Sequence, residues 1–121
     1  MADKLRSRII DAVIANPFQV DQALLCSTSW VLYSDAEIPA VVLDFHSEGT
    51  VEIKSKNEIS KMDWDLVGEE LIISIFGHAA FRGKVYAYQN IFICLFTENN
   101  EAALIMVSVE KWKEIRLVLN N

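Results

Sequence analysis

Glycine, proline, cysteine and histidine are all scarce in this 121-residue chain, which has four glycines, two prolines, two cysteines and two histidines. With so few glycines the chain has no glycine-rich phosphate-binding loop, and no G-x-S-x-G hydrolase motif occurs. His46 and His78 do not lie at metal-ligand spacing with either cysteine, and no HxH or HExxH arrangement occurs. We therefore expect no metal and no cofactor, and we assign no catalytic residue.

The two cysteines, Cys26 and Cys94, lie among apolar neighbours in the segments ALLCS and IFICLF. A disulfide between them is geometrically possible, but nothing in the sequence indicates an oxidising compartment. Buried free thiols are therefore the favoured interpretation. A Cys–His catalytic pair is less favoured, because a reactive thiol needs partial exposure and a positive neighbourhood.

Long apolar runs are absent as well. The longest, residues 91–96 and 102–107, suit buried strands and are too short to cross a bilayer. The first ten residues mix charges throughout and lack the apolar core of a signal peptide. Basic residues are outnumbered, and the net charge of −6 repels phosphate backbones. These features predict a cytoplasmic protein with neither a membrane nor a nucleic-acid partner.

Apolar residues are abundant. They make up 52% of the chain against 23% charged residues, which excludes disorder, and the length predicts a single domain. The mean hydropathy of +0.22 is high for a lone soluble domain. The surplus apolar side chains require an enclosed cavity, a partner surface or a dimer interface.

The stretch from His46 to Phe76 contains short runs in which apolar and polar residues alternate. Met62, Trp64 and Leu66 alternate with charged residues, and turn signals fall at 47–49, 56–58 and 68–69. Successive side chains of a strand face opposite sides, so this pattern predicts strands with one wet face. The links are too short for parallel crossovers, which makes the strands antiparallel.

We divide the single domain into a helical cover at 1–29, a β-meander at 30–108, and a helix or strand at 109–121. Helical spacing predicts a helix over 3–15 and a short second helix within 18–26. The strands at 91–96 and 102–107 are apolar on both faces, so both sides of the sheet must be covered there. The predicted fold class is α+β: an antiparallel meander of seven or eight strands, curved or barrel-like, with the N-terminal helices packed against it.

Aromatic side chains recur on successive predicted strands, at Trp30, Phe45, Trp64, Phe76 and Phe81. If the sheet curls, several of them converge inside, where they form either an ordinary core or a ligand pocket.

One face of the strand at 80–88 carries two cations and two tyrosines, namely Arg82, Lys84, Tyr86 and Tyr88. Tyrosines beside cations stack on rings or sugars, face a protein partner, or pack across strands. The predicted ligand-binding set, drawn from both groups, is Trp30, Phe45, Trp64, Phe76, Arg82, Tyr86 and Tyr88.

The order of signals resembles a known family. Trp30 opens the first strand, Gly49-Thr50 forms a hairpin, Asn57-Glu58 precedes Trp64, and Gly68-Glu69-Glu70-Leu71 leads into the next strand. This series, from Trp30 to Val107, resembles the lipocalin-like (calycin) small bacterial β-barrel domains found beside sugar and polysaccharide genes. The short chain and its N-terminal helices favour a half-open barrel, or one completed by dimerisation. The resemblance carries over no catalytic residue.

The favoured function is a non-catalytic binding module that holds a small apolar or carbohydrate-like ligand inside the curved sheet. The alternative is a protein-interaction subunit, either a homodimer or an adaptor for another protein, that uses exposed apolar sheet surface. A small hydrolase that uses His46 or His78 with nearby carboxylates is the least favoured interpretation.

Overall fold

The computed structural model describes residues 2–33, 41–97, 99, 101–112 and 114. In chain order its elements are α1 (Ala2–Ala15), β1 (Phe18–Gln19), α2 (Gln22–Cys26), β2 (Trp30–Leu32), β3 (Val41–Phe45), β4 (Thr50–Ser55), β5 (Glu58–Val67), β6 (Glu70–Ile75), β7 (His78–Tyr88), β8 (Phe92–Phe96) and β9 (Ala102–Ser108). Residues 109–112 and 114 are helical, and the rest of the predicted C-terminal element, 113 and 115–121, lies outside the described residues. No helix within the described ranges has the length and apolarity of a membrane span.

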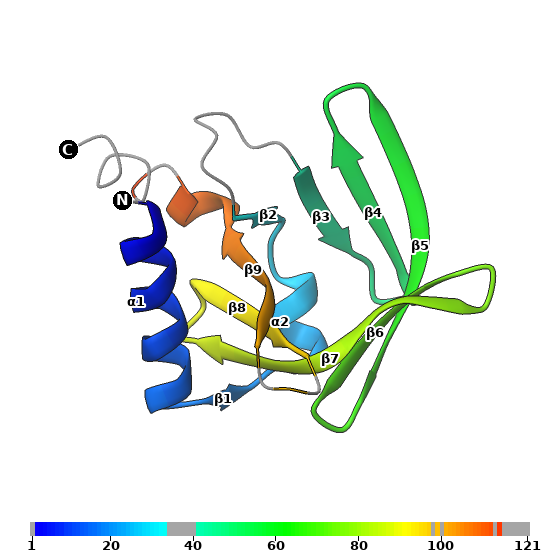
Figure 1. Cartoon of the computed structure of the whole chain (residues 1–121). Helices are drawn as coiled ribbons and strands as arrows, with labels where there is room; N and C mark the ends of the chain where they lie inside the picture. Colours follow the sequence, from blue (N-terminus) through cyan, green and yellow to red (C-terminus); the bar gives the residue numbers. More distant parts are fainter. Residues whose placement is uncertain (1, 34–40, 98, 100, 113, 115–121) are drawn as a thin grey trace.

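Strands β2 to β9 form a closed antiparallel barrel. Each strand pairs with the next along the chain, and β2 also pairs with β9, so the eight strands make a ring (Figure 1). The predicted fold class is confirmed. The expectation of a half-open barrel, or of one completed by dimerisation, was wrong, because Trp30, Val31 and Leu32 pair with Ser108, Val107 and Met106 of the same chain. The closed antiparallel barrel is the architecture that the calycin resemblance implies.

The barrel interior is filled by the apolar faces of its strands. The predicted alternation is confirmed, since Leu43, Val51 and Trp64 are buried inside while Met62 and Leu66 pack against the same cluster. The fully buried side chains of this interior cluster include Trp30, Leu71, Ile73, Val85 and Ile93. Such packing of a small barrel is typical when the strands are few.

The segment 18–26 is only partly helical. Helix α2 begins after Asp21, whose carboxylate caps it by accepting from the Leu24 amide at 2.8 Å, and Leu25 packs into the barrel core. Phe18 and Gln19, predicted within the same helix, instead form β1. They pair with Ala87 and Tyr86 of β7. This part of the β7 edge is open because β6 pairs with β7 only as far as Lys84.

Helix α1 covers the outside of the barrel next to β7 and β8 (Figure 1). Its Ile9 and Val13 are buried against Cys94, Phe96 and Ile105. Strands β8 and β9 therefore bury one face in the barrel. Their other face is covered by α1 at Cys94, Phe96 and Ile105 and by Trp112 at Val107, which explains why the sequence is apolar on both faces.

The two cysteines are free thiols, as predicted, but only Cys94 is fully buried, and Cys26 is partly exposed. Cys26 packs against the interior cluster, whereas Cys94 belongs to the outer cluster under α1. The barrel wall thus separates them. Burial raises the pKa of Cys94 to about 12, so its thiol stays protonated and unreactive.

Two hairpins, β4–β5 and β6–β7, extend away from α1 on the far side of the barrel (Figure 1). The β6–β7 turn places Phe76 and Gly77 at φ +52° and +80°. Positive φ at both central residues is the mark of a type I′ turn, whose twist matches that of the strands.

Gly83 is predicted to be essential for the pairing of β7 with β8. A Cβ atom at this position would lie 2.3 Å from the Phe96 carbonyl oxygen and 2.7 Å from Leu95 Cδ2. Because one of these atoms belongs to the backbone, Gly83→Ala should lower the free energy of unfolding by about 3 kcal/mol, measured by chemical denaturation. Gly77→Ala is the matched control, since it meets no atom within 4 Å and costs only the left-handed backbone, about 1 kcal/mol. Equal losses for the two variants would contradict the close approach.

Candidate functional site

Three residues of the predicted ligand-binding set converge in the barrel. Trp30 is fully buried, and Phe45 meets Trp64 edge to face with ring centroids 5.7 Å apart. The indole of Trp30 donates to the Leu25 carbonyl at 3.0 Å, and that of Trp64 to the His46 carbonyl at 2.9 Å. Both polar atoms are satisfied and the rings pack as core. A ligand contact for these three residues stays a prediction.

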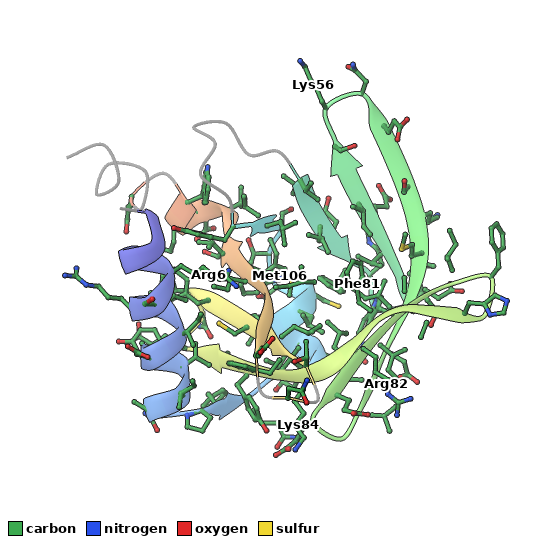
Figure 2. All side chains as sticks on the ribbon, viewed as in Figure 1. Arg6, Lys56, Phe81, Arg82, Lys84 and Met106 are labelled. Carbon is green, nitrogen blue, oxygen red and sulfur yellow. The ribbon has the colours of Figure 1, made fainter. Side chains whose placement is uncertain are left out.

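Phe76 does not join them. It lies in the β6–β7 turn with 91% of its surface exposed, so its expected place inside the curved sheet was wrong. The reason is local: the Phe76-Gly77 pair forms the turn itself, where a side chain projects from the tip of the hairpin. Phe81 faces the interior side of β7 opposite Ile73, yet it is 42% exposed at the rim (Figure 2).

The other three members share the outer face of β7, as predicted, but each has a different partner. Arg82 donates from Nε and Nη2 to Glu70 Oε2 at 3.3 and 3.1 Å. The Tyr86 hydroxyl donates to Glu69 Oε2 at 3.0 Å. Tyr88 stacks obliquely on Phe92, with ring centroids 6.3 Å apart.

A pocket of about 650 Å³ opens between the end of α1 and the outer face of β7. We call it the outer groove; α1, the α1–β1 link, β1, the β5–β6 turn, β7 and β8 supply its walls. Its lining residues are Val13, Ile14, Pro17, Gln19, Glu69, Lys84, Tyr86 and Phe96. The volume lies in the range of small-molecule sites.

The walls of the outer groove divide into an apolar side and a polar side. Val13, Ile14 and Phe96 form much of the apolar side, and Ile14 is 57% exposed. On the polar side, burial raises the pKa of Tyr86, and its hydrogen bond to the Glu69 carboxylate raises it further. The phenol therefore stays a hydrogen-bond donor at neutral pH.

Sequence reasoning found Tyr86, and Lys84 beside it, but missed the rest of the outer groove. Gln19 escaped because β1 exists only through its pairing with β7, a contact between residues far apart in the chain. Glu69 was recognised as part of a turn signal, and only the barrel brings that turn beside Tyr86.

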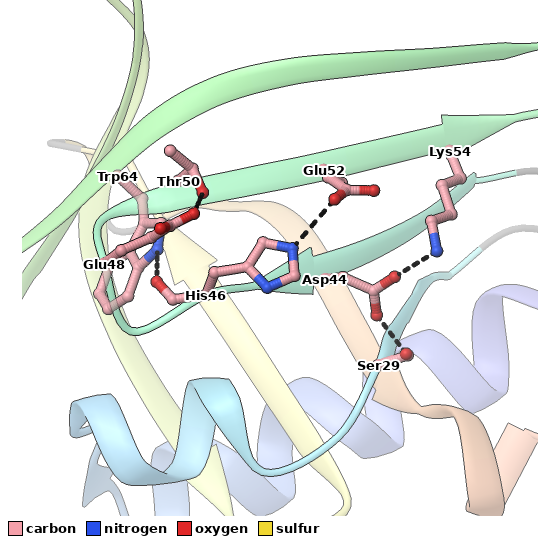
Figure 3. Close-up of polar contacts among 8 residues, drawn as sticks. All are labelled: Ser29, Asp44, His46, Glu48, Thr50, Glu52, Lys54 and Trp64. Atoms are coloured by element: carbon pink, nitrogen blue, oxygen red, sulfur yellow. Dashed lines mark hydrogen bonds and ion pairs between the residues drawn. The ribbon is translucent and has the colours of Figure 1, made fainter.

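A polar network covers the outer face of β3 and β4 (Figure 3). Ser29 Oγ donates to one oxygen of Asp44, and Lys54 Nζ lies 2.8 Å from the other. Next to this pair, His46 Nε2 lies 3.2 Å from Glu52 Oε1. These contacts fasten the α2–β2 link to β3 and tie β3 to β4.

The same network bears on the hydrolase interpretation. Within the described part of the chain, the ring of His46 bonds to Glu52, and no bond joins it to a serine, threonine or cysteine. His78 is exposed at the start of β7. No group of three or more His, Cys, Asp or Glu residues, among those described, is arranged to hold a metal ion. The network is best understood as a set of hydrogen bonds between β3, β4 and the α2–β2 link, with one ion pair between Lys54 and Asp44.

A scan of protein-family models, a search of curated proteins and a search of solved structures each found no match to this chain.

Asp44 is predicted to make the stability of the fold depend on pH in the acid range. Burial raises the pKa of its carboxyl, but hydrogen bonds from Lys54 and Ser29 and the charge of Lys54 outweigh this effect, so the pKa lies below its ordinary value. A carboxyl whose pKa is lower in the folded than in the unfolded state stabilises the fold at pH values above its unfolded-state pKa. This stabilisation is lost as the pH falls through the folded-state pKa. Asp44→Asn should therefore lower the free energy of unfolding at pH 7 by about 1 kcal/mol and change it little at pH 2.

Denaturant titrations of both proteins at several pH values measure this effect. Glu48→Gln is a suitable control, because Glu48 accepts only from the neighbouring Thr50 hydroxyl. If the free energies of unfolding of the wild type and Asp44→Asn differ by the same amount at pH 7 and at pH 2, the charge of the Asp44 carboxylate is not the cause of the difference.

Proposed function

We propose that this domain is a non-catalytic binding module that holds a small amphipathic, carbohydrate-like ligand in the outer groove. The observation that carries the proposal is the pocket of about 650 Å³, where an apolar wall faces the polar side chains of Gln19, Glu69, Lys84 and Tyr86. A concave site with a few convergent polar groups is the usual form of a small-ligand site.

The groove chemistry suits a sugar-like molecule. A sugar ring has an apolar C–H face and a rim of hydroxyls, which need both donors and acceptors. The exposed Ile14 and Pro17 offer an apolar surface, while the Gln19 amide supplies a donor and an acceptor. The Glu69 carboxylate adds further acceptor capacity beyond the Tyr86 bond.

The barrel has the role of a scaffold in this proposal. Its interior is packed by Trp30, Phe45 and Trp64, which supports a ligand site on the outer face instead of inside the curved sheet. A rigid strand such as β7 holds Lys84 and Tyr86 at a fixed spacing. Membership of the lipocalin-like family is part of the same proposal, supported by the closed antiparallel barrel.

Ligand binding in the outer groove predicts a local response to sugars. In a ¹⁵N–¹H NMR titration with neutral and acidic mono- and disaccharides, shifts should concentrate at Val13, Gln19 and Tyr86. Ile14→Ser should then weaken binding of the tightest sugar about fivefold, because apolar contact area is lost at an exposed position.

The matched control is Ile59→Ser, which makes the same change at an equally exposed isoleucine of β5 that does not line the groove. Shifts confined to the barrel interior, or no response to any sugar, would overturn the proposed site.

A second candidate function is a protein-interaction subunit, and the β6–β7 hairpin favours it. From Leu71 to Phe81 the chain carries no Asp, Glu, Lys or Arg, and Phe76 is 91% exposed at the tip. The exposed Ile75 and Phe81 lie on the interior side of the same hairpin. In a twofold-symmetric dimer, Phe76 of each copy would pack against Ile75 and Phe81 of the other copy. We therefore expect self-association through this hairpin.

Self-association through the hairpin predicts a concentration-dependent mass in analytical ultracentrifugation. Phe76→Ser should weaken the dimer at least about tenfold, since an aromatic anchor contributes strongly to an interface. Phe18→Ser is the control, because Phe18 is 63% exposed but belongs to β1. A wild-type chain that stays monomeric at millimolar concentration would remove this candidate.

A further inference from the structure

Among the described residues that line the outer groove, Lys84 alone carries a positive charge, and no described carboxylate forms an ion pair with its ammonium. The closest carboxylate in register is that of Glu70, which lies directly opposite Lys84 in the β6–β7 ladder. Glu70, however, accepts both the Nε and the Nη2 hydrogens of Arg82. Figure 2 shows Arg82 and Lys84 extending from the same strand.

The second acidic residue at the groove is also engaged. Glu69 Oε2 accepts the hydroxyl of Tyr86 at 3.0 Å. Of the residues that the structure describes, none forms a hydrogen bond or ion pair with Lys84 Nζ, and none bonds to the Gln19 amide. Among the described residues, the groove thus holds an ammonium and an amide without partners, beside Glu69, whose carboxylate is bonded to a neutral phenol. The neighbouring Glu70 is paired with Arg82.

We propose that the outer groove binds a sugar acid, and that Lys84 is the residue that recognises its carboxylate. The inference depends on the proposed function, and it specifies the charge of the ligand. A carboxylate on a sugar ring would accept from the Lys84 ammonium in a charge-assisted hydrogen bond. The ring hydroxyls would meet Gln19 and Glu69, and the C–H face would lie on the apolar wall.

The charge balance of the site favours a single negative charge on the ligand. One ammonium can neutralise a carboxylate, but a phosphate at neutral pH approaches two charges and needs several donors. Glu69 and Glu70 lie close by, and the whole chain has a net charge of −6. Both repel a dianion more strongly than a monoanion.

The test compares matched sugars by calorimetry and NMR on the full chain: glucose with glucuronate, and cellobiose with its uronate. The uronates should bind roughly tenfold more tightly than the neutral sugars at low salt, and the difference should shrink as ionic strength rises. Lys84→Met should abolish the preference, so that the neutral sugars and their uronates bind with equal affinity. Lys84→Arg should retain it.

A control variant, Lys56→Met, removes a lysine at the tip of the β4–β5 hairpin, away from the groove, and should leave the preference intact (Figure 2). Equal binding of neutral and acidic sugars in the groove would overturn this inference and leave the proposed function standing. Failure of every sugar to bind would overturn the proposed function itself. Tighter binding of inorganic phosphate than of either uronate would overturn the assignment of a monoanion.

Discussion

The pairing of β2 with β9 is the constraint on which the rest of the structure depends. It joins the two ends of the meander, so that the eight strands have a common inside and a common outside. Without this contact the sheet would be open, and neither apolar face of β8 and β9 would be enclosed in a barrel interior. With it, Ile93 and Leu95 face the core, while Cys94 and Phe96 face α1.

The outer groove is a product of the same arrangement. Helix α1 is needed to cover the outward apolar face of the barrel, but it lies across β7 and β8 only where that face is apolar. At the end of α1, β7 presents Lys84 and Tyr86, and the helix leaves a hollow beside them. β1 closes one side by extending the edge of β7. The groove therefore lies where the apolar outer surface covered by α1 ends and the polar outer face of β7 begins.

The sequence was informative wherever structure depends on neighbours along the chain. Alternation at Met62, Trp64 and Leu66, and the turn glycines Gly49 and Gly68 with positive φ, made the meander predictable. Prediction failed for β1, which has two residues and is a strand only because β7 has an open edge. The groove was found only in part, through Tyr86, because its walls come from distant segments. Phe76 was misplaced because alternation does not extend into a turn.

Cys26 and Cys94 lie on opposite sides of the barrel wall, and this position decides whether the two thiols can form a disulfide. An intramolecular cross-link would require one side chain to pass through a hydrogen-bonded ladder, so oxidation has no route to lock or distort this chain from within. The barrel therefore holds together without a covalent cross-link between these two thiols, and its folding needs no oxidising medium.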